Sequence, residues 1–172
     1  YYNFKGLNLS LETLDGLVKH NGPISNTKKL DLILGKNFFK NKINYKKNAS
    51  LESQLASISD DIAYNNHDLE DGLRANLYKI DDLKKIPILS EVINKHKQFL
   101  KNRGTELVIR QLIRDIINEM VNDIITNTQK NLKEKKIKHI KDIYNNKDQI
   151  VSFSKEMNYF DVEIKSFLRE KM

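Results

Sequence analysis

The chain contains no cysteine and no run of apolar residues long enough to cross a membrane. Without cysteine it can form neither a disulfide framework nor a thiolate metal site, which suits a reducing compartment. A membrane-spanning helix needs about 18 consecutive apolar residues, and neither such a run nor a secretory signal is visible. Glycine and proline are also missing after Gly104, which favours long uninterrupted helices there. We therefore expect a cytoplasmic protein with no membrane partner.

The remaining composition is that of a globular, basic protein. Among 172 residues, 39% are apolar and 31% are charged, a balance that excludes a disordered chain. The formal net charge of +7 favours anionic partners such as phosphates, nucleotides or nucleic acid. Because the sequence opens with Tyr1 rather than methionine, we expect it to be a piece of a longer protein.

Apolar residues recur at helical spacing along most of the chain, and no alternating run bounded by turn residues predicts a sheet. We therefore predict an all-α fold. Ser10 and Ser50 are expected to cap two of the helices. The helices are expected at residues 11–20, 28–34, 50–75, 89–102, 105–134, 137–145 and 149–171.

Three of these helices carry apolar stripes that should be buried or form subunit contacts. Such stripes are compatible with a homo-oligomer, which the family resemblance described below implies. The stripe of the third helix comprises Leu51, Leu55, Ile58, Ile62, Leu69 and Leu73. That of the longest helix comprises Leu107, Ile109, Leu112, Ile113, Ile116, Ile117, Met120, Val121, Ile124 and Ile125. The last helix carries Phe153, Met157, Phe160, Ile164, Phe167 and Leu168.

Another face of the third helix is acidic. Asp60, Tyr64 and Asp68 are four residues apart, so each step rotates only about 40° and rises about 6 Å along the helix. Asp71 extends this row, and Asp61 and Glu70 flank it. Neighbouring carboxylates repel, so the row needs a counter-charge from a metal, an Arg or Lys elsewhere, or water. Spacing alone is equally compatible with an ordinary solvated helix face.

Two sequence blocks resemble a known family. They are GLNLSLETLDGLVKHNGP at residues 6–23 and SLESQLASISDDIAYNNHDLEDGLRA at residues 50–75. The second is similar to SxExQxAxxADDIAYxxHDxxDGLRAG of the HD-domain deoxynucleoside triphosphate triphosphohydrolases, the bacterial dGTPase-like group. Later helices also resemble the family's C-terminal region. The resemblance implies a fragment of an HD-domain-like bundle, with the distal catalytic domain at 1–85 and a C-terminal helical region at 86–172.

The resemblance also implies roles for four residues. Asp60 matches a ligand of a divalent metal, Mg²⁺, Mn²⁺ or Fe²⁺. Tyr64 matches a nucleotide contact, and Asp68 matches the acceptor of the sugar 3′-hydroxyl. Lys19 matches a contact to the triphosphate, although its place at a helix C-terminus also fits a surface cation that complements the helix dipole. The implied reaction hydrolyses a dNTP to deoxynucleoside and inorganic triphosphate.

The sequence lacks the part of the family's catalytic domain that carries most of its metal ligands. The family's upstream helices carry its other metal ligands and its catalytic histidine, and they are not in this sequence. The His67-Asp68 dipeptide follows the distal Asp and is not assigned to the metal. His20, His96 and His139 are expected at the surface. We assign no catalytic residue and expect the 172 residues alone to be inactive.

Two other functions remain open. An all-α module could bind single-stranded nucleic acid, because residues 24–49 combine basic and aromatic side chains. The cluster Lys130, Lys133, Lys135, Lys136, Lys138 and Lys141 adds to this basic surface, although such clusters are usually solvated. An HD-type phosphohydrolase with another substrate, such as a monophosphate, is the third alternative, and Tyr64 and Asp68 argue against it.

Overall fold

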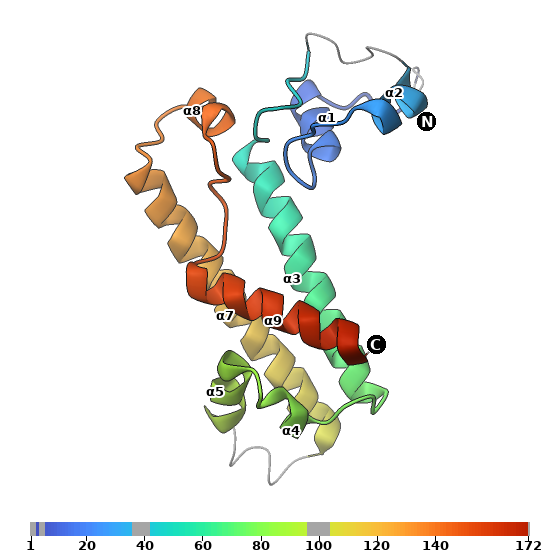
Figure 1. Ribbon diagram of the computed structural model, residues 1–172, viewed down its shortest axis with the longest axis vertical. Coiled ribbons are helices and arrows are strands. Elements are labelled where there is room, and N and C mark those ends of the chain that lie inside the picture. The colour runs from blue at the N-terminus through green and yellow to red at the C-terminus, as the bar shows by residue number, and fades with distance from the viewer. Residues whose placement is uncertain (1–2, 4–5, 36–41, 96–103, 172) are drawn as a thin grey trace. The chain divides into compact units, whose positions relative to one another are not determined.

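A computed structural model describes residues 3, 6–35, 42–95 and 104–171 (Figure 1). Throughout these residues the chain is helical with turns and contains no strand, which confirms the predicted all-α class. The helices are α1 Leu11–Val18, α2 Lys28–Leu34, α3 Leu51–Arg74, α4 Ile80–Leu83, α5 Pro87–Lys95, α7 Thr105–Glu134, α8 Ile140–Asn145 and α9 Lys155–Lys171.

The chain divides into two compact units. Unit 1 comprises Tyr1–Ile58 and Asn131–Val151, and unit 2 comprises Ser59–Lys130 and Ser152–Met172. The division falls inside α3 and inside α7, so each of these helices contributes to both units. The boundary between residues 85 and 86, which the family resemblance implies, is a different kind of division and stays a prediction.

Serine side chains begin three of the helices. The Ser10 hydroxyl accepts a hydrogen bond from the Thr13 amide at 3.2 Å, as predicted for α1. Ser50 does the same for α3, and Ser154 for α9. Each hydroxyl satisfies an N–H group that has no partner within its own helix.

Three helix starts differ from the predicted ones, and one helix is missed. The helix expected from 137 begins at Ile140, and Lys136 just before it has a left-handed φ of 53°. The helix expected from 89 begins at Pro87, because proline lacks an N–H and its fixed φ suits the first helical position. Its expected residues 96–102 lie outside the described part of the chain. The last helix begins at Lys155 rather than 149, and α4 occupies Ile80–Leu83 where a break was predicted.

The core of unit 2 comes mainly from α7, with α3, α5 and α9 around it. The buried side chains of α7 are Val108, Ile109, Leu112, Ile113, Ile116, Met120 and Ile124. Those of α9 include Met157, Phe160, Ile164 and Leu168. Ile62, Leu69 and Leu73 of α3 are buried as predicted. Leu107, Val121 and Ile125 belong to the predicted stripe but are exposed within the chain, because the apolar stripe of α7 is wider than the face that its neighbours cover. Their burial in a subunit contact stays a prediction.

Unit 1 has a smaller apolar core, formed by Ile43, Ala49, Ile143, Ile150 and Val151. Helix α1 contributes no fully buried residue. Leu55 on α3 is also exposed rather than buried. Here the buried position on the helix is taken by its polar neighbour Gln54.

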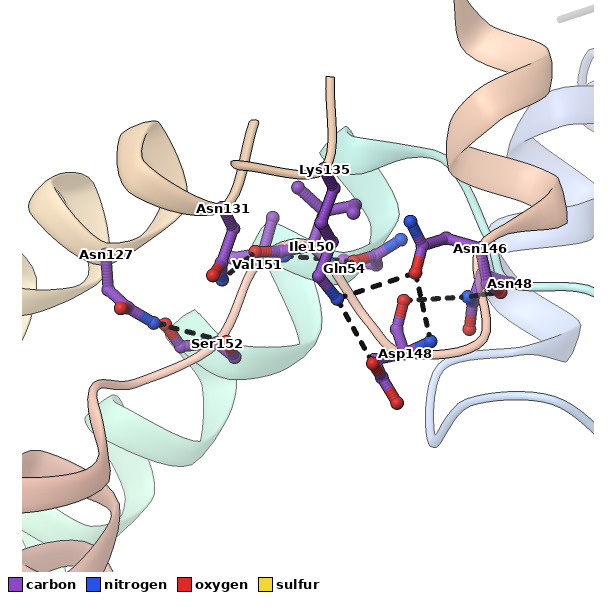
Figure 2. A network of polar contacts seen from close by, with 10 residues as sticks. All are labelled: Asn48, Gln54, Asn127, Asn131, Lys135, Asn146, Asp148, Ile150, Val151 and Ser152. Carbon is purple, nitrogen blue, oxygen red and sulfur yellow. Dashed lines mark hydrogen bonds and ion pairs between the residues drawn. The ribbon is translucent and has the colours of Figure 1, made fainter. Parts of the chain in front are cut away.

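Amide side chains hold an irregular, non-helical segment of unit 1, residues 146–151 (Figure 2). Gln54 accepts hydrogen bonds from the amides of Ile150 and Val151 at 2.8 and 3.1 Å and donates to the Ala49 carbonyl at 2.9 Å. Asn48 donates to the carbonyls of 146 and 148, and Asn131 donates to the Ile150 carbonyl. The segment thereby satisfies its backbone without a sheet.

Candidate functional site

The second half of α3 presents the predicted row on its exposed side. Asp60, Tyr64 and Asp68 are all exposed, with Tyr64 at 64% of its full accessible surface. The opposite side of the same helix is buried, and Leu69 there is fully inaccessible. The helix is continuous from Leu51 to Arg74, so the four-residue spacing does keep the three groups near one edge. This edge is therefore accessible to a ligand.

Asp61, next to Asp60, is held by the last helix. The Lys165 ammonium on α9 lies 3.5 Å from an Asp61 carboxylate oxygen and 2.8 Å from the buried Asp161 carboxylate. Asp161 in turn accepts a hydrogen bond of 2.7 Å from the side chain of Asn65 on α3. Four side chains thus form one continuous polar chain between α3 and α9 within unit 2.

The Lys165 ammonium remains charged in this partly buried position. Burial by itself would lower the pKa of Lys165, but hydrogen bonding and attraction to Asp161 and then to Asp61 outweigh it and raise the pKa above its ordinary value. The predicted need for a counter-charge is met here, for the flanking acid Asp61, by a lysine of the same chain.

The other flanking acid, Glu70, is paired with Arg74. Arg74 donates to Glu70 through two nitrogens, at 2.9 and 2.7 Å, and reaches Glu106 on α7 at 3.3 Å. Hydrogen bonding to Glu70 is the main cause that raises the pKa of Arg74. Because these groups are largely exposed, the pair adds little to stability and mainly reduces the negative charge beside the row.

The backbone beneath the row is supported by Tyr78. Its hydroxyl donates to the Leu69 carbonyl at 3.1 Å, with the Asp68 carbonyl at 3.4 Å, and its ring meets the Phe167 ring of α9 edge-on at 4.8 Å between centroids. The Tyr78 side chain lies so close to Gly72 that a Cβ there would be 2.4 Å from the hydroxyl oxygen and 2.5 Å from two ring carbons. Burial raises the pKa of Tyr78 to about 12, with smaller contributions from Asp68 and Asp71.

Lys19 lies in unit 1 and is buried. Its side chain is 2% exposed, its ammonium is 2.6 Å from Asp15, and it donates to the Asn48 carbonyl at 3.4 Å. The interpretation of Lys19 as a surface cation is therefore wrong, because it closes an internal ion pair behind α1. It also lines a cavity of about 370 Å³ with Lys42, Lys47, Lys141 and Tyr144 among its neighbours. Its predicted contact to a triphosphate stays a prediction.

A complete metal site does not occur within the described residues. No three His, Asp or Glu side chains there lie together in a way that could hold an ion. Asp60 offers one exposed carboxylate, so the described residues do not by themselves fit the implied metal, and further ligands would have to come from elsewhere. His67 is exposed, His139 is exposed at the start of α8, and His96 lies outside the described residues.

The sequence analysis missed the residues that support the row, namely Asn65, Asp161, Lys165 and Tyr78. One local signal existed: Asp161 and Lys165 are four residues apart on a helix, a spacing at which opposite charges meet. The two asparagines at 65 and 66 were a second signal, because they interrupt the apolar pattern of α3 at positions that the structure buries. Neither signal reveals which distant segment they contact.

Among the described residues, no helix combines the length and apolar character needed to cross a membrane. No protein-family model matches the chain. Curated proteins do match it along its whole length. A deoxyguanosinetriphosphate triphosphohydrolase-like protein of Pelagibacter ubique is 49% identical over 172 residues, which are all of this chain and 46% of the relative. Proteins of the same name from Bartonella tribocorum and Rickettsia bellii are 40% and 34% identical, again over the whole chain and over 44% of each relative.

These matches confirm the resemblance that the two sequence blocks indicated. The chain spans less than half the length of the curated relatives that it matches. Over its entire length, this chain is similar to part of the deoxyguanosinetriphosphate triphosphohydrolase-like proteins.

Proposed function

We propose that the chain is part of a metal-dependent hydrolase that cleaves a dNTP of the dGTP type into a deoxynucleoside and inorganic triphosphate. The names of its relatives support this class of substrate. The observation that carries the proposal is the exposed row of Asp60, Tyr64 and Asp68 on a helix whose other face is anchored in a core. Such a row is rigid and open to a nucleotide.

Each residue of the row suits a different part of that ligand. The Asp68 carboxylate can accept a hydrogen bond from a sugar hydroxyl, and the Tyr64 ring offers both an aromatic surface and a hydroxyl group. Asp60 would contribute one oxygen ligand to a divalent ion, whose other ligands lie outside the described residues. We propose Lys19 as the contact to the phosphates, which requires its ammonium to exchange Asp15 for the ligand.

A test of the sugar contact compares dGTP with 2′,3′-dideoxy-GTP, which lacks only the 3′-hydroxyl. Binding of each nucleotide to the 172-residue chain is followed through the amide resonances of α3. If Asp68 accepts from that hydroxyl, dGTP should bind about tenfold more tightly, which is the usual size of a hydrogen bond to a charged group. Asp68→Asn should reduce the difference.

The matched control is Asp71→Asn, another exposed carboxylate on the same helix. It should leave the preference for dGTP intact. Equal binding of both nucleotides to the unmodified chain would refute the assigned role of Asp68. Turnover is tested separately by measuring triphosphate release from each dNTP with Mg²⁺ or Mn²⁺. The chain alone should release none, and robust release would contradict the absence of catalytic residues from it.

An alternative function is binding of single-stranded nucleic acid. Lys133, Lys136, Lys138 and Lys141 are exposed over nine positions of unit 1, which favours an anionic polymer. This alternative predicts DNA binding that weakens steeply with salt and survives Asp60→Ala. Homo-oligomer formation and a cytoplasmic location also stay predictions, and the mass of the particle in solution checks the first.

A further inference from the structure

Among the described residues of unit 2, the most buried charged group lies in the polar chain between α3 and α9. Asp161 is 7% exposed as a residue, and both of its carboxylate oxygens are engaged: one by Asn65 at 2.7 Å and the other by Lys165 at 2.8 Å. A buried carboxylate is costly unless it is paired and hydrogen-bonded, so this arrangement is well defined. Lys165 is the only member that reaches beyond the buried pair to an exposed acid, Asp61.

The position of this contact on α3 relates it to the row. Successive residues of a helix differ by about 100°, so Asp61 lies on the edge between Asp60 and the buried side. Asn65 follows Asp61 by one turn on the same edge. Both anchor points for α9 therefore border the exposed row on one side, and between them they fix how far α3 can rotate about its axis.

The charge of Asp61 matters for the same row. An uncompensated carboxylate there would stand beside Asp60, Tyr64 and Asp68 and repel an approaching triphosphate. The Lys165 ammonium compensates it at 3.5 Å, while the buried Asp161 prevents the lysine from leaving. The two adjacent aspartates therefore differ in their surroundings: Asp61 faces α9 and its lysine, and Asp60 faces the exposed side.

We propose that Lys165 is a positioning residue for the nucleotide site: it partly offsets the charge of Asp61 and, through Asp161 and Asn65, holds α3 in the orientation that presents Asp60, Tyr64 and Asp68 together. This role deepens the proposed function and rests on it for the identity of the ligand. It assigns to the last helix, which carries no residue of the row, a direct effect on the affinity of the row for a polyanion.

The test uses the 172-residue chain and three substitutions. Lys165→Met removes the charge and keeps the aliphatic stem, and Lys165→Arg keeps the charge. Lys155→Met is the matched control, because Lys155 is an exposed lysine at the start of the same helix. For each variant, the amide resonances of residues 60–68, the thermal midpoint and the affinity for dGTP are measured.

Lys165→Met should shift the backbone amide resonances of residues 60–68 and the side-chain amide resonance of Asn65. It should also weaken dGTP binding about two- to fivefold, the range expected for one partly exposed ion pair. Lys165→Arg should restore both, and Lys155→Met should change neither. Adding Asp61→Asn to Lys165→Met should recover dGTP affinity, because it removes the repelling charge. A merely structural lysine would not show that recovery.

Failure of this inference can be told apart from failure of the proposed function. If the unmodified chain binds dGTP but Lys165→Met binds it equally well, or if Asp61→Asn brings no recovery, the inference is overturned and the proposed function stands. If the unmodified chain binds no nucleotide, the proposed function fails in this chain. The positioning role of Lys165 is then judged from the amide resonances of α3 alone. Resonances of 60–68 that are unchanged in Lys165→Met overturn the positioning role, and shifts that Lys165→Arg reverses support it.

Discussion

Gly72 is the position where the packing of α3 should be least tolerant of added volume. A Cβ built there would lie 2.4 Å from the Tyr78 hydroxyl oxygen and 2.5 Å from two ring carbons. The ring cannot easily move aside, because its hydroxyl donates to Leu69 at 3.1 Å and its edge contacts Phe167. Gly72→Ala should therefore force α3 and the Tyr78 ring apart.

The expected magnitude combines two opposing effects. Alanine is favoured over glycine inside a helix by about 1 kcal/mol. Overpacking a well-filled core costs about 1–3 kcal/mol, and contacts of 2.4 to 2.5 Å place this site at the upper end. Gly72→Ala should thus lower the free energy of unfolding by about 1–2 kcal/mol in spite of its better helix propensity.

Urea denaturation followed by circular dichroism measures this change, and two further variants isolate its cause. His67→Ala raises helix propensity at an exposed position of the same helix and should be neutral or stabilising. With Tyr78→Ala already present, Gly72→Ala should become stabilising, because the ring that opposed the methyl group is gone. A Gly72→Ala protein as stable as the unmodified one would refute the reasoning.

Three further predictions concern stability and pH. Gln54→Leu leaves the amides of 150–151 buried without acceptors and should destabilise the fold by about 2–4 kcal/mol in urea titrations, whereas an unchanged midpoint would contradict the role of the glutamine. The pKa of Tyr78 is raised from 10.0 to about 12 in the folded protein, so its contribution to the free energy of unfolding is fully present below pH 10 and is lost as the pH rises towards 12. Tyr78→Phe should remove the resulting alkaline decline in the thermal midpoint. Hydrogen bonds from the backbone N–H groups of 138–139 lower the pKa of Asp142 below its ordinary 3.8. Its contribution to the free energy of unfolding is therefore present above pH 3.8 and is lost as the pH falls through the lowered pKa. Asp142→Asn should reduce the decline of the thermal midpoint at acidic pH.

The helices were largely predictable from the sequence because their signals are local. Apolar spacing and the serine caps at 10 and 50 placed α1, α2, α3 and α7 to within a few residues. Helix α4 was missed because four residues are too few to show a period. The segment from 149 to 154 was expected to be helical, and it is not, because amide side chains from distant helices engage its backbone groups.

The candidate site, too, was predictable only where its geometry depends on local spacing. The row of Asp60, Tyr64 and Asp68 depends only on helical spacing, so the sequence could predict that the three lie on one edge. Its supports could not be predicted, because Asn65 and Asp161 are separated by 96 residues and their pairing is decided by the packing of α9 on α3. Burial of Lys19 was missed for the same reason, since its carbonyl acceptor at Asn48 is 29 residues away.

The irregular segment at 146–151 has a consequence for how this protein behaves at high concentration. Backbone N–H and C=O groups without partners can pair with a strand from another molecule and begin a fibril. Here glutamine and asparagine side chains already occupy several of the amides and carbonyls that would make that pairing. The segment is thereby protected from recruiting a neighbour, although it belongs to no helix.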